Sequence, residues 1–165
     1  MYLLDANTYI QAKNLHYQMS FCPAYWHWLD EQFQAGQLAS ISSVYHELTV
    51  QNDELTEWVK MRKAHFLPVS SEDIQDQFGS VAEYVSGLED KKAEHIADFL
   101  GNADPWLVAT ACASGATVVT HEAPVPDNSS KVKIPNVCRA FDVPYITTYE
   151  LLNTLDAQFV LGRSS

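Results

Sequence analysis

The sequence has 165 residues, 47% of them hydrophobic, with 21 acidic and 10 basic residues that give a formal net charge of −11. Its length fits one domain over residues 1–165, and its charge argues against a protein that binds nucleic acid through many phosphate contacts. No apolar run approaches the roughly 20 residues of a membrane span, no secretion signal is evident, and the three widely spaced cysteines predict reduced thiols, so we expect a cytoplasmic protein without a membrane segment.

The first predicted element is a short strand over residues 2–4 that ends in Asp5. Residues 6–8 form a turn into an apolar-periodic helix, and a second helix is predicted over residues 23–34, before Gly36. Asp5 is therefore expected at the carboxyl end of a strand.

A second strand is predicted over residues 38–41, and Ser42 or Ser43 can cap the helix that follows it. Glu47 lies at the border of the apolar face of that helix, where its carboxylate can look into a cleft. Residues 66–69 predict another short strand.

The middle of the chain is predicted to be mostly helical, over residues 53–64, 71–88 and 91–100. Asp104 then opens the most apolar helix, residues 106–113. Because Pro105 follows it, Asp104 has the sequence features of an ordinary helix N-cap.

The last third begins with a β-branched strand over residues 117–120, followed closely by Glu122. Residues 123–136 are rich in Pro, Ser, Asp and Asn and predict a long functional loop. A short strand over residues 145–147 and a helix over residues 148–155 complete the chain.

Strands that alternate with helices predict an α/β fold: a three-layer α/β/α domain around a mainly parallel sheet. Ligands bind such sheets beyond the carboxyl ends of the strands. Asp5 and Glu122 follow strands, and Asp104 and Glu47 lie on helices next to strands, so all four acids are expected around one cleft.

Carboxylates in this arrangement suit Mg²⁺ or Mn²⁺, which prefer oxygen ligands and keep several waters. One or two such ions activate water for hydrolysis of a phosphodiester. Each acid also has an ordinary explanation, because Asp5 or Asp104 can cap a helix, and Glu47 or Glu122 can be surface charge.

Several segments together resemble the PIN-domain superfamily. Tyr2–Asn7 is similar to its opening strand and acid, Ser42–Leu48 to its Glu-bearing helix, Asp104 to its Asp-opened helix, and Val118–Glu122 to its Thr-x-Asp element. The similarity runs from residue 2 to about residue 145.

The resemblance implies a PIN-like fold, like that of small bacterial ribonuclease toxins that require Mg²⁺ or Mn²⁺ and are inhibited by a cognate antitoxin. It implies that Asp5, Glu47, Asp104 and Glu122 are catalytic and that all of these except Glu47 bind metal. It also implies an RNA substrate, an antitoxin partner and, in many such proteins, a homodimer. Asn7 and Thr120 would support the metal water or a neighbouring carboxylate.

Two departures point to a divergent subgroup. Glu122 stands where the superfamily usually has Asp, so its longer side chain is expected to bind metal less directly. The loop after it is long, and within it Lys131 and Lys133, two residues apart, would project to the same side if extended and could hold phosphates.

Two other functions are compatible with the sequence. A catalytically silent PIN-like module would use its acidic surface to bind a basic partner, consistent with the net charge of −11. An aspartate-nucleophile phosphotransferase is suggested by Leu4–Thr8, although Asn7 replaces the acidic residue that such an enzyme needs.

Overall fold

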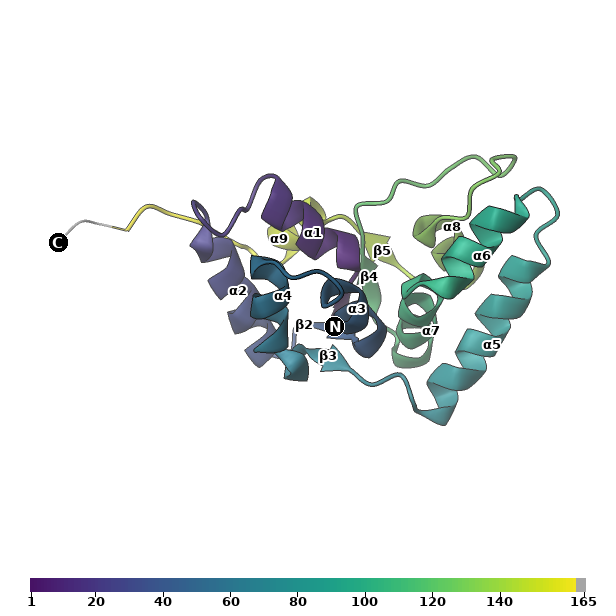
Figure 1. Ribbon diagram of the computed structural model, residues 1–165, viewed down its shortest axis with the longest axis horizontal. Helices are drawn as coiled ribbons and strands as arrows, with labels where there is room; N and C mark the ends of the chain where they lie inside the picture. Colours follow the sequence, from purple (N-terminus) through teal and green to yellow (C-terminus); the bar gives the residue numbers. More distant parts are fainter. Residues whose placement is uncertain (163–165) are drawn as a thin grey trace.

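A parallel sheet lies at the centre of the computed structural model, which describes residues 1–162. Within that range it has five strands in the order β3-β2-β1-β4-β5 (Figure 1). The strands are β1 (Tyr2–Leu4), β2 (Leu38–Ile41), β3 (Phe66–Leu67), β4 (Thr117–Val119) and β5 (Tyr145–Ile146). The predicted parallel α/β sheet is confirmed, and its strand order reverses between β1 and β4.

The central strand β1 fixes the register of the sheet. Tyr2 lies opposite Leu38 of β2 and Thr117 of β4, and Leu4 lies opposite Val119. The Asp5 amide continues this pairing by donating to the Val119 carbonyl at 3.0 Å. Asp5 is therefore held in place by the backbone of the sheet.

Helices cover both faces of the sheet: α1–α4 gather on one side and α5–α8 on the other (Figure 1). Their bounds are α1 (Ala6–Asn14), α2 (Pro23–Gln34), α3 (Ser42–Leu48), α4 (Glu54–Lys60), α5 (Glu72–Ser86), α6 (Ala93–Gly101), α7 (Asp104–Ser114), α8 (Ile134–Ala140) and α9 (Thr148–Thr154), with a 3-10 turn at Lys63–His65. This is the predicted three-layer α/β/α architecture.

Helix α7 is the most deeply embedded helix of its layer. Leu107 and Val108 are fully buried, and the helix packs along α5 and against β2, β4 and α8. It ends at Gly115, which adopts a left-handed conformation with φ of 67°. Such a conformation favours glycine, so the predicted end of this helix is confirmed.

Three local predictions were wrong. The loop predicted over residues 123–136 ends earlier than expected, since helix α8 begins at Ile134. Pro135 lies in the first turn of this helix, where proline is compatible with helical geometry. Asp104 is the first residue of α7 and Ala103 is its N-cap. Ser42 likewise begins α3, and no side chain caps that helix.

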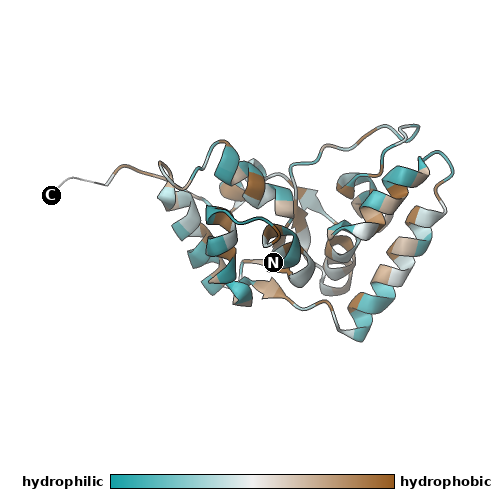
Figure 2. Cartoon of the chain, in the orientation of Figure 1, coloured by the Kyte–Doolittle hydropathy of each residue, from teal (hydrophilic) through white to brown (hydrophobic). Residues whose placement is uncertain are grey.

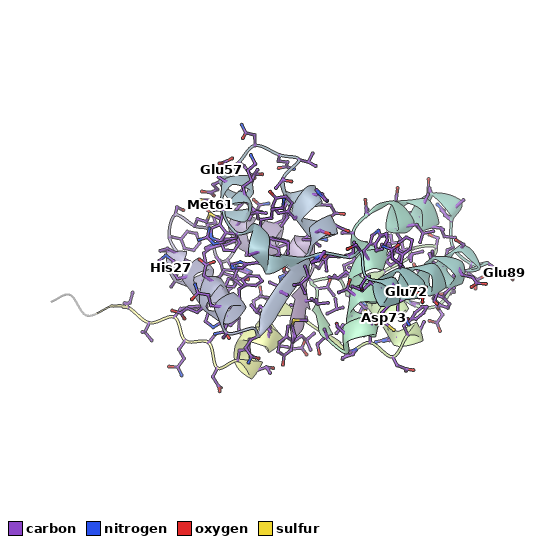
Figure 3. The ribbon with its side chains drawn as sticks, turned by 90° about the horizontal axis from the view of Figure 1, so that it is seen from below. His27, Glu57, Met61, Glu72, Asp73 and Glu89 are labelled. Carbon is purple, nitrogen blue, oxygen red and sulfur yellow. The ribbon has the colours of Figure 1, made fainter. Side chains whose placement is uncertain are left out.

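Hydrophilic residues are spread over the outer faces of the helices, as Figure 2 shows for α4 and α6. Glu57, Glu72, Asp73 and Glu89 are exposed and point away from the body of the protein (Figure 3). Much of the excess negative charge is therefore distributed over the surface. Among residues 1–162, no helix is both long and apolar enough to cross a membrane.

Candidate functional site

Asp5 lies where β1 passes into α1. It occupies the N-cap position of α1. The Asn7 amide in the first turn of that helix lowers the pKa of Asp5, so a contact with the helix start accompanies the role of this acid in the pocket. The residue is only 2% exposed, and its Oδ2 accepts a hydrogen bond from the Thr120 hydroxyl at 3.0 Å. Burial raises the pKa of Asp5 to about 6, against the lowering effect of the Thr120 hydrogen bond.

Asp104 is half-buried at the start of α7. Among residues 1–162 no group donates a hydrogen bond to its carboxylate, which also excludes the capping role expected from Pro105. Burial, together with the neighbouring carboxylates of Asp5, Glu122 and Glu47, raises its pKa to about 8. The charged form of Asp104 is therefore destabilised by its surroundings.

Glu47 ties two distant segments together. It lies exposed on α3, and its Oε1 accepts a hydrogen bond from the Ala103 amide at 2.7 Å, across 56 residues of sequence. Ala103 immediately precedes Asp104. The expected placement of Glu47 beside Asp104 is thus found, with one of its oxygens used to hold the start of α7.

Glu122 has both carboxylate oxygens occupied. Oε1 accepts a hydrogen bond from the Lys133 ammonium at 2.7 Å, and Oε2 accepts one from the Ile134 amide at 2.8 Å. Its own amide donates to the Thr120 hydroxyl at 3.1 Å. Glu122 thus joins the end of β4 to the start of α8.

A pocket of about 630 Å³ collects these four acids. Asn7, Lys131 and Lys133 also line it, so the structure brings together all the side chains that the sequence placed at the site except Thr120, which lies behind Asp5. The pocket opens beyond the carboxyl ends of β1 and β4, where the strand order reverses. Parallel α/β sheets bind ligands at this position.

Helix α6 supplies a wall of the pocket that the sequence did not reveal. His95, Asp98 and Asn102 line the pocket and share one face of this helix. Their spacing was the available signal. The sequence pattern assigned this segment only as a helix over residues 91–100 and did not indicate that it faces the site.

The long loop between β4 and α8 is fastened to the start of α6. The Lys91 ammonium donates to the Asp127 and Ser129 carbonyls, each at 2.7 Å. The Lys92 amide donates to the Ser130 carbonyl at 3.1 Å, and His95 Nδ1 lies 2.7 Å from the same oxygen. These contacts hold Lys131 and Lys133 at the pocket.

The donor set fits a hard divalent cation bound through few protein ligands. Both oxygens of Asp104 are without a hydrogen-bond donor among residues 1–162. Asp5 accepts a hydrogen bond from the Thr120 hydroxyl, and the Asn7 amide also lowers its pKa. Across the same residues, no three Asp, Glu, His or Cys side chains form a ready metal cage. Asp5 and Asp104 would hold Mg²⁺ or Mn²⁺ with water completing its shell, because these ions usually keep several waters.

The fold is PIN-like. One chain in the crystal structure of VapBC2 from Rickettsia felis, bound to a DNA fragment from their promoter, matches with 17% identity and a TM-score of 0.54, over 88% of this chain and 97% of that one. A chain of FitAcB from Neisseria gonorrhoeae matches with 17% identity and a TM-score of 0.49, over 88% and 96%. A search of curated proteins found no match.

At the level of sequence, the matching family model is described as a domain of unknown function, DUF4411, and it covers residues 2–159. The chain belongs to this family.

Proposed function

We propose that this protein is a metal-dependent endoribonuclease that hydrolyses RNA phosphodiesters and acts as the toxin of a toxin–antitoxin pair. The observation that carries the proposal is the pair of acids Asp5 and Asp104, which share a pocket and have pKa values raised to about 6 and about 8. Perturbed acids that converge in a pocket are typical of functional sites.

Within this proposal, each residue has a distinct task. Asp5 and Asp104 hold Mg²⁺ or Mn²⁺, which when bound supplies an activated water and stabilises the leaving oxygen. Thr120 orients Asp5 through its hydrogen bond, and Glu47 keeps the start of α7 in place. The toxin role, the RNA substrate and the antitoxin partner rest on the resemblance to the PIN-domain superfamily.

The experiment is RNA cleavage with Mn²⁺ or Mg²⁺ by the wild type, Asp5→Asn and Asp104→Asn. Each substitution is expected to lower kcat about a hundredfold or more, because each removes a ligand of the ion. Asp30→Asn, an acid outside the pocket, is the matched control and should cleave at the wild-type rate. Equal activity in all four proteins would contradict the proposal.

A catalytically silent binding module is the second candidate. It is favoured by the net charge of −11 and by the internal hydrogen bonds that occupy the Glu122 carboxylate. In that case, the wild type would cleave no RNA with either ion, and millimolar Mn²⁺ would not raise its melting temperature.

A further inference from the structure

The pocket contains a cation of its own. The Lys133 ammonium lies 2.7 Å from Glu122 Oε1, and the side chains of the pair are 32% and 16% exposed. The side chains of both residues are thus partly shielded from water, while Lys133 still lines the pocket. A partly desolvated ion pair holds its geometry better than a surface pair does.

Hydrogen bonds hold both the side chain and the backbone of Glu122, so this residue can position the Lys133 ammonium. The Ile134 amide holds its second oxygen, and Thr120 holds its backbone. Since Thr120 also donates to Asp5, one hydrogen-bonded series runs from Lys133 through Glu122 and Thr120 to Asp5. The position of the ammonium is therefore coupled to that of the buried acid.

The ammonium also acts on the other acid of the site. Lys133 lowers the pKa of Asp104, against the three carboxylates that raise it. An ammonium carries three N–H donors, and Glu122 uses one of them. The other donors remain for an anionic group that enters the pocket.

Building on the proposed ribonuclease function, we propose that Glu122 is a positioning residue that holds the Lys133 ammonium in the pocket, where it binds a phosphate oxygen of the RNA in the place of a second metal ion. The metal site is then a one-ion site formed by Asp5 and Asp104. Two-ion sites use their second cation to neutralise charge on the reacting phosphate. A preorganised ammonium supplies such charge without a further set of ligands.

Titration calorimetry with MnCl₂ on the full chain tests the pair without requiring catalysis. Lys133→Met should tighten Mn²⁺ binding about tenfold, because it removes a neighbouring positive charge, and Glu122→Gln should weaken it by a similar factor. The double variant removes both charges and should return to within about threefold of the wild type. Lys60→Met, on the outer face of α4, controls for the loss of one lysine and should have no effect.

RNA cleavage tests the phosphate contact. Lys133→Met and the double variant should both lose about a hundredfold in kcat, even though the double variant binds Mn²⁺ normally. Lys133→Arg should recover part of the rate because it retains the charge. Lys133→Gln, which keeps a donor for Glu122, replaces Lys133→Met if the latter fails to fold.

Two results would overturn the inference alone. If the double variant binds Mn²⁺ as weakly as Glu122→Gln, then Glu122 is a metal ligand. If Lys133→Met cleaves RNA at the wild-type rate, Lys133 only fastens the loop. A wild type that binds Mn²⁺ and cleaves no RNA overturns the proposed function and the phosphate contact together. In that case, calorimetry still tests whether the Lys133–Glu122 pair affects Mn²⁺ binding.

Discussion

The acids of the pocket and the acids of the α1–α4 layer differ in their partners. In that layer, Asp30 receives two hydrogen bonds from the Arg62 guanidinium, at 2.6 and 2.8 Å. Asp53 binds Lys13 at 2.6 Å and caps α4 through the Thr56 amide at 2.9 Å. Asp104, by contrast, has three acidic neighbours and no hydrogen-bond donor among residues 1–162.

This contrast shows where the protein gains stability and where it loses it. Lys13 and the Thr56 amide lower the pKa of Asp53, whereas burial raises the pKa of Asp5 to about 6. Asp30 and Asp53, which are paired, stabilise the helical layer, while the burial of Asp5 and Asp104 in the pocket is a cost to the folded state. Such a cost is typical of functional sites.

The largest expected change in stability is produced by a divalent cation. Mn²⁺ at about 100 times its Kd should stabilise the wild type by roughly 2.7 kcal/mol, which corresponds to a rise of roughly 5–10 °C in Tm. Asp104→Asn should abolish the rise, because it removes a ligand, and Asp30→Asn should retain it. Differential scanning calorimetry provides the measurement, and a full rise in Asp104→Asn would contradict the contrast.

The next largest effect is expected in the paired region. Arg62 binds Asp30, donates to the Trp58 carbonyl at 3.1 Å and lies 4.2 Å above the Trp58 ring. Arg62→Met should therefore lower the free energy of unfolding by about 2 kcal/mol, since it leaves a half-buried acid without its partner. Urea unfolding measures this loss, and the change of Tm with Mn²⁺ should remain.

A smaller effect is expected from pH in the metal-free protein. The folded state keeps protons on Asp5 and Asp104, with pKa values of about 6 and about 8, that the unfolded chain has already released. Stability should therefore fall as pH rises from about 5 to about 8, because the folded state binds more protons in this window. Tm measured in EDTA should drop by a few degrees in the wild type, and Asp104→Asn should flatten the profile.

The smallest effect, of opposite sign, is expected at Asp53. Its lowered pKa means that the Lys13 contact stabilises the protein above about pH 4 and is lost as pH falls below that. Lys13→Met should lower Tm by about 1–2 °C at pH 7, as expected for a partly exposed ion pair. The wild type and Lys13→Met should have the same Tm near pH 3. A difference in Tm that persists at this pH would mean that Lys13 stabilises the protein through packing of its side chain and not through the ion pair.

The elements that the sequence predicted best have a strong local signal. Residues 23–34 and 38–41 form the expected helix and strand, because Pro23 and Gly36 bound the helix and three of the four strand residues are apolar. Helix α8 was missed because its first residues follow a polar, proline-rich stretch. The composition of residues 123–136 is typical of a loop. Helix α8 packs against α7, and this tertiary contact cannot be inferred from local composition.

The site was predictable as a set of residues and not as a set of contacts. Strand ends placed Asp5 and Glu122 together, which the pocket bears out. The bond from Glu122 to Lys133 depends on the path of the loop, and the bond from Glu47 to Ala103 crosses 56 residues. Neither contact is encoded by a periodic sequence pattern. The three-dimensional structure was therefore needed to identify the carboxylate oxygens that are available to an ion.

The central position of β1 has a consequence for synthesis of the protein. Asp5 is enclosed by Thr120, which follows it by 115 residues, and the sheet reverses its order at this junction. A ribosome-bound chain that stops short of β4 can pair β1 with β2 yet has neither the Thr120 hydrogen bond nor the Glu122–Lys133 pair. The pocket therefore assembles late, after most of the chain has been translated.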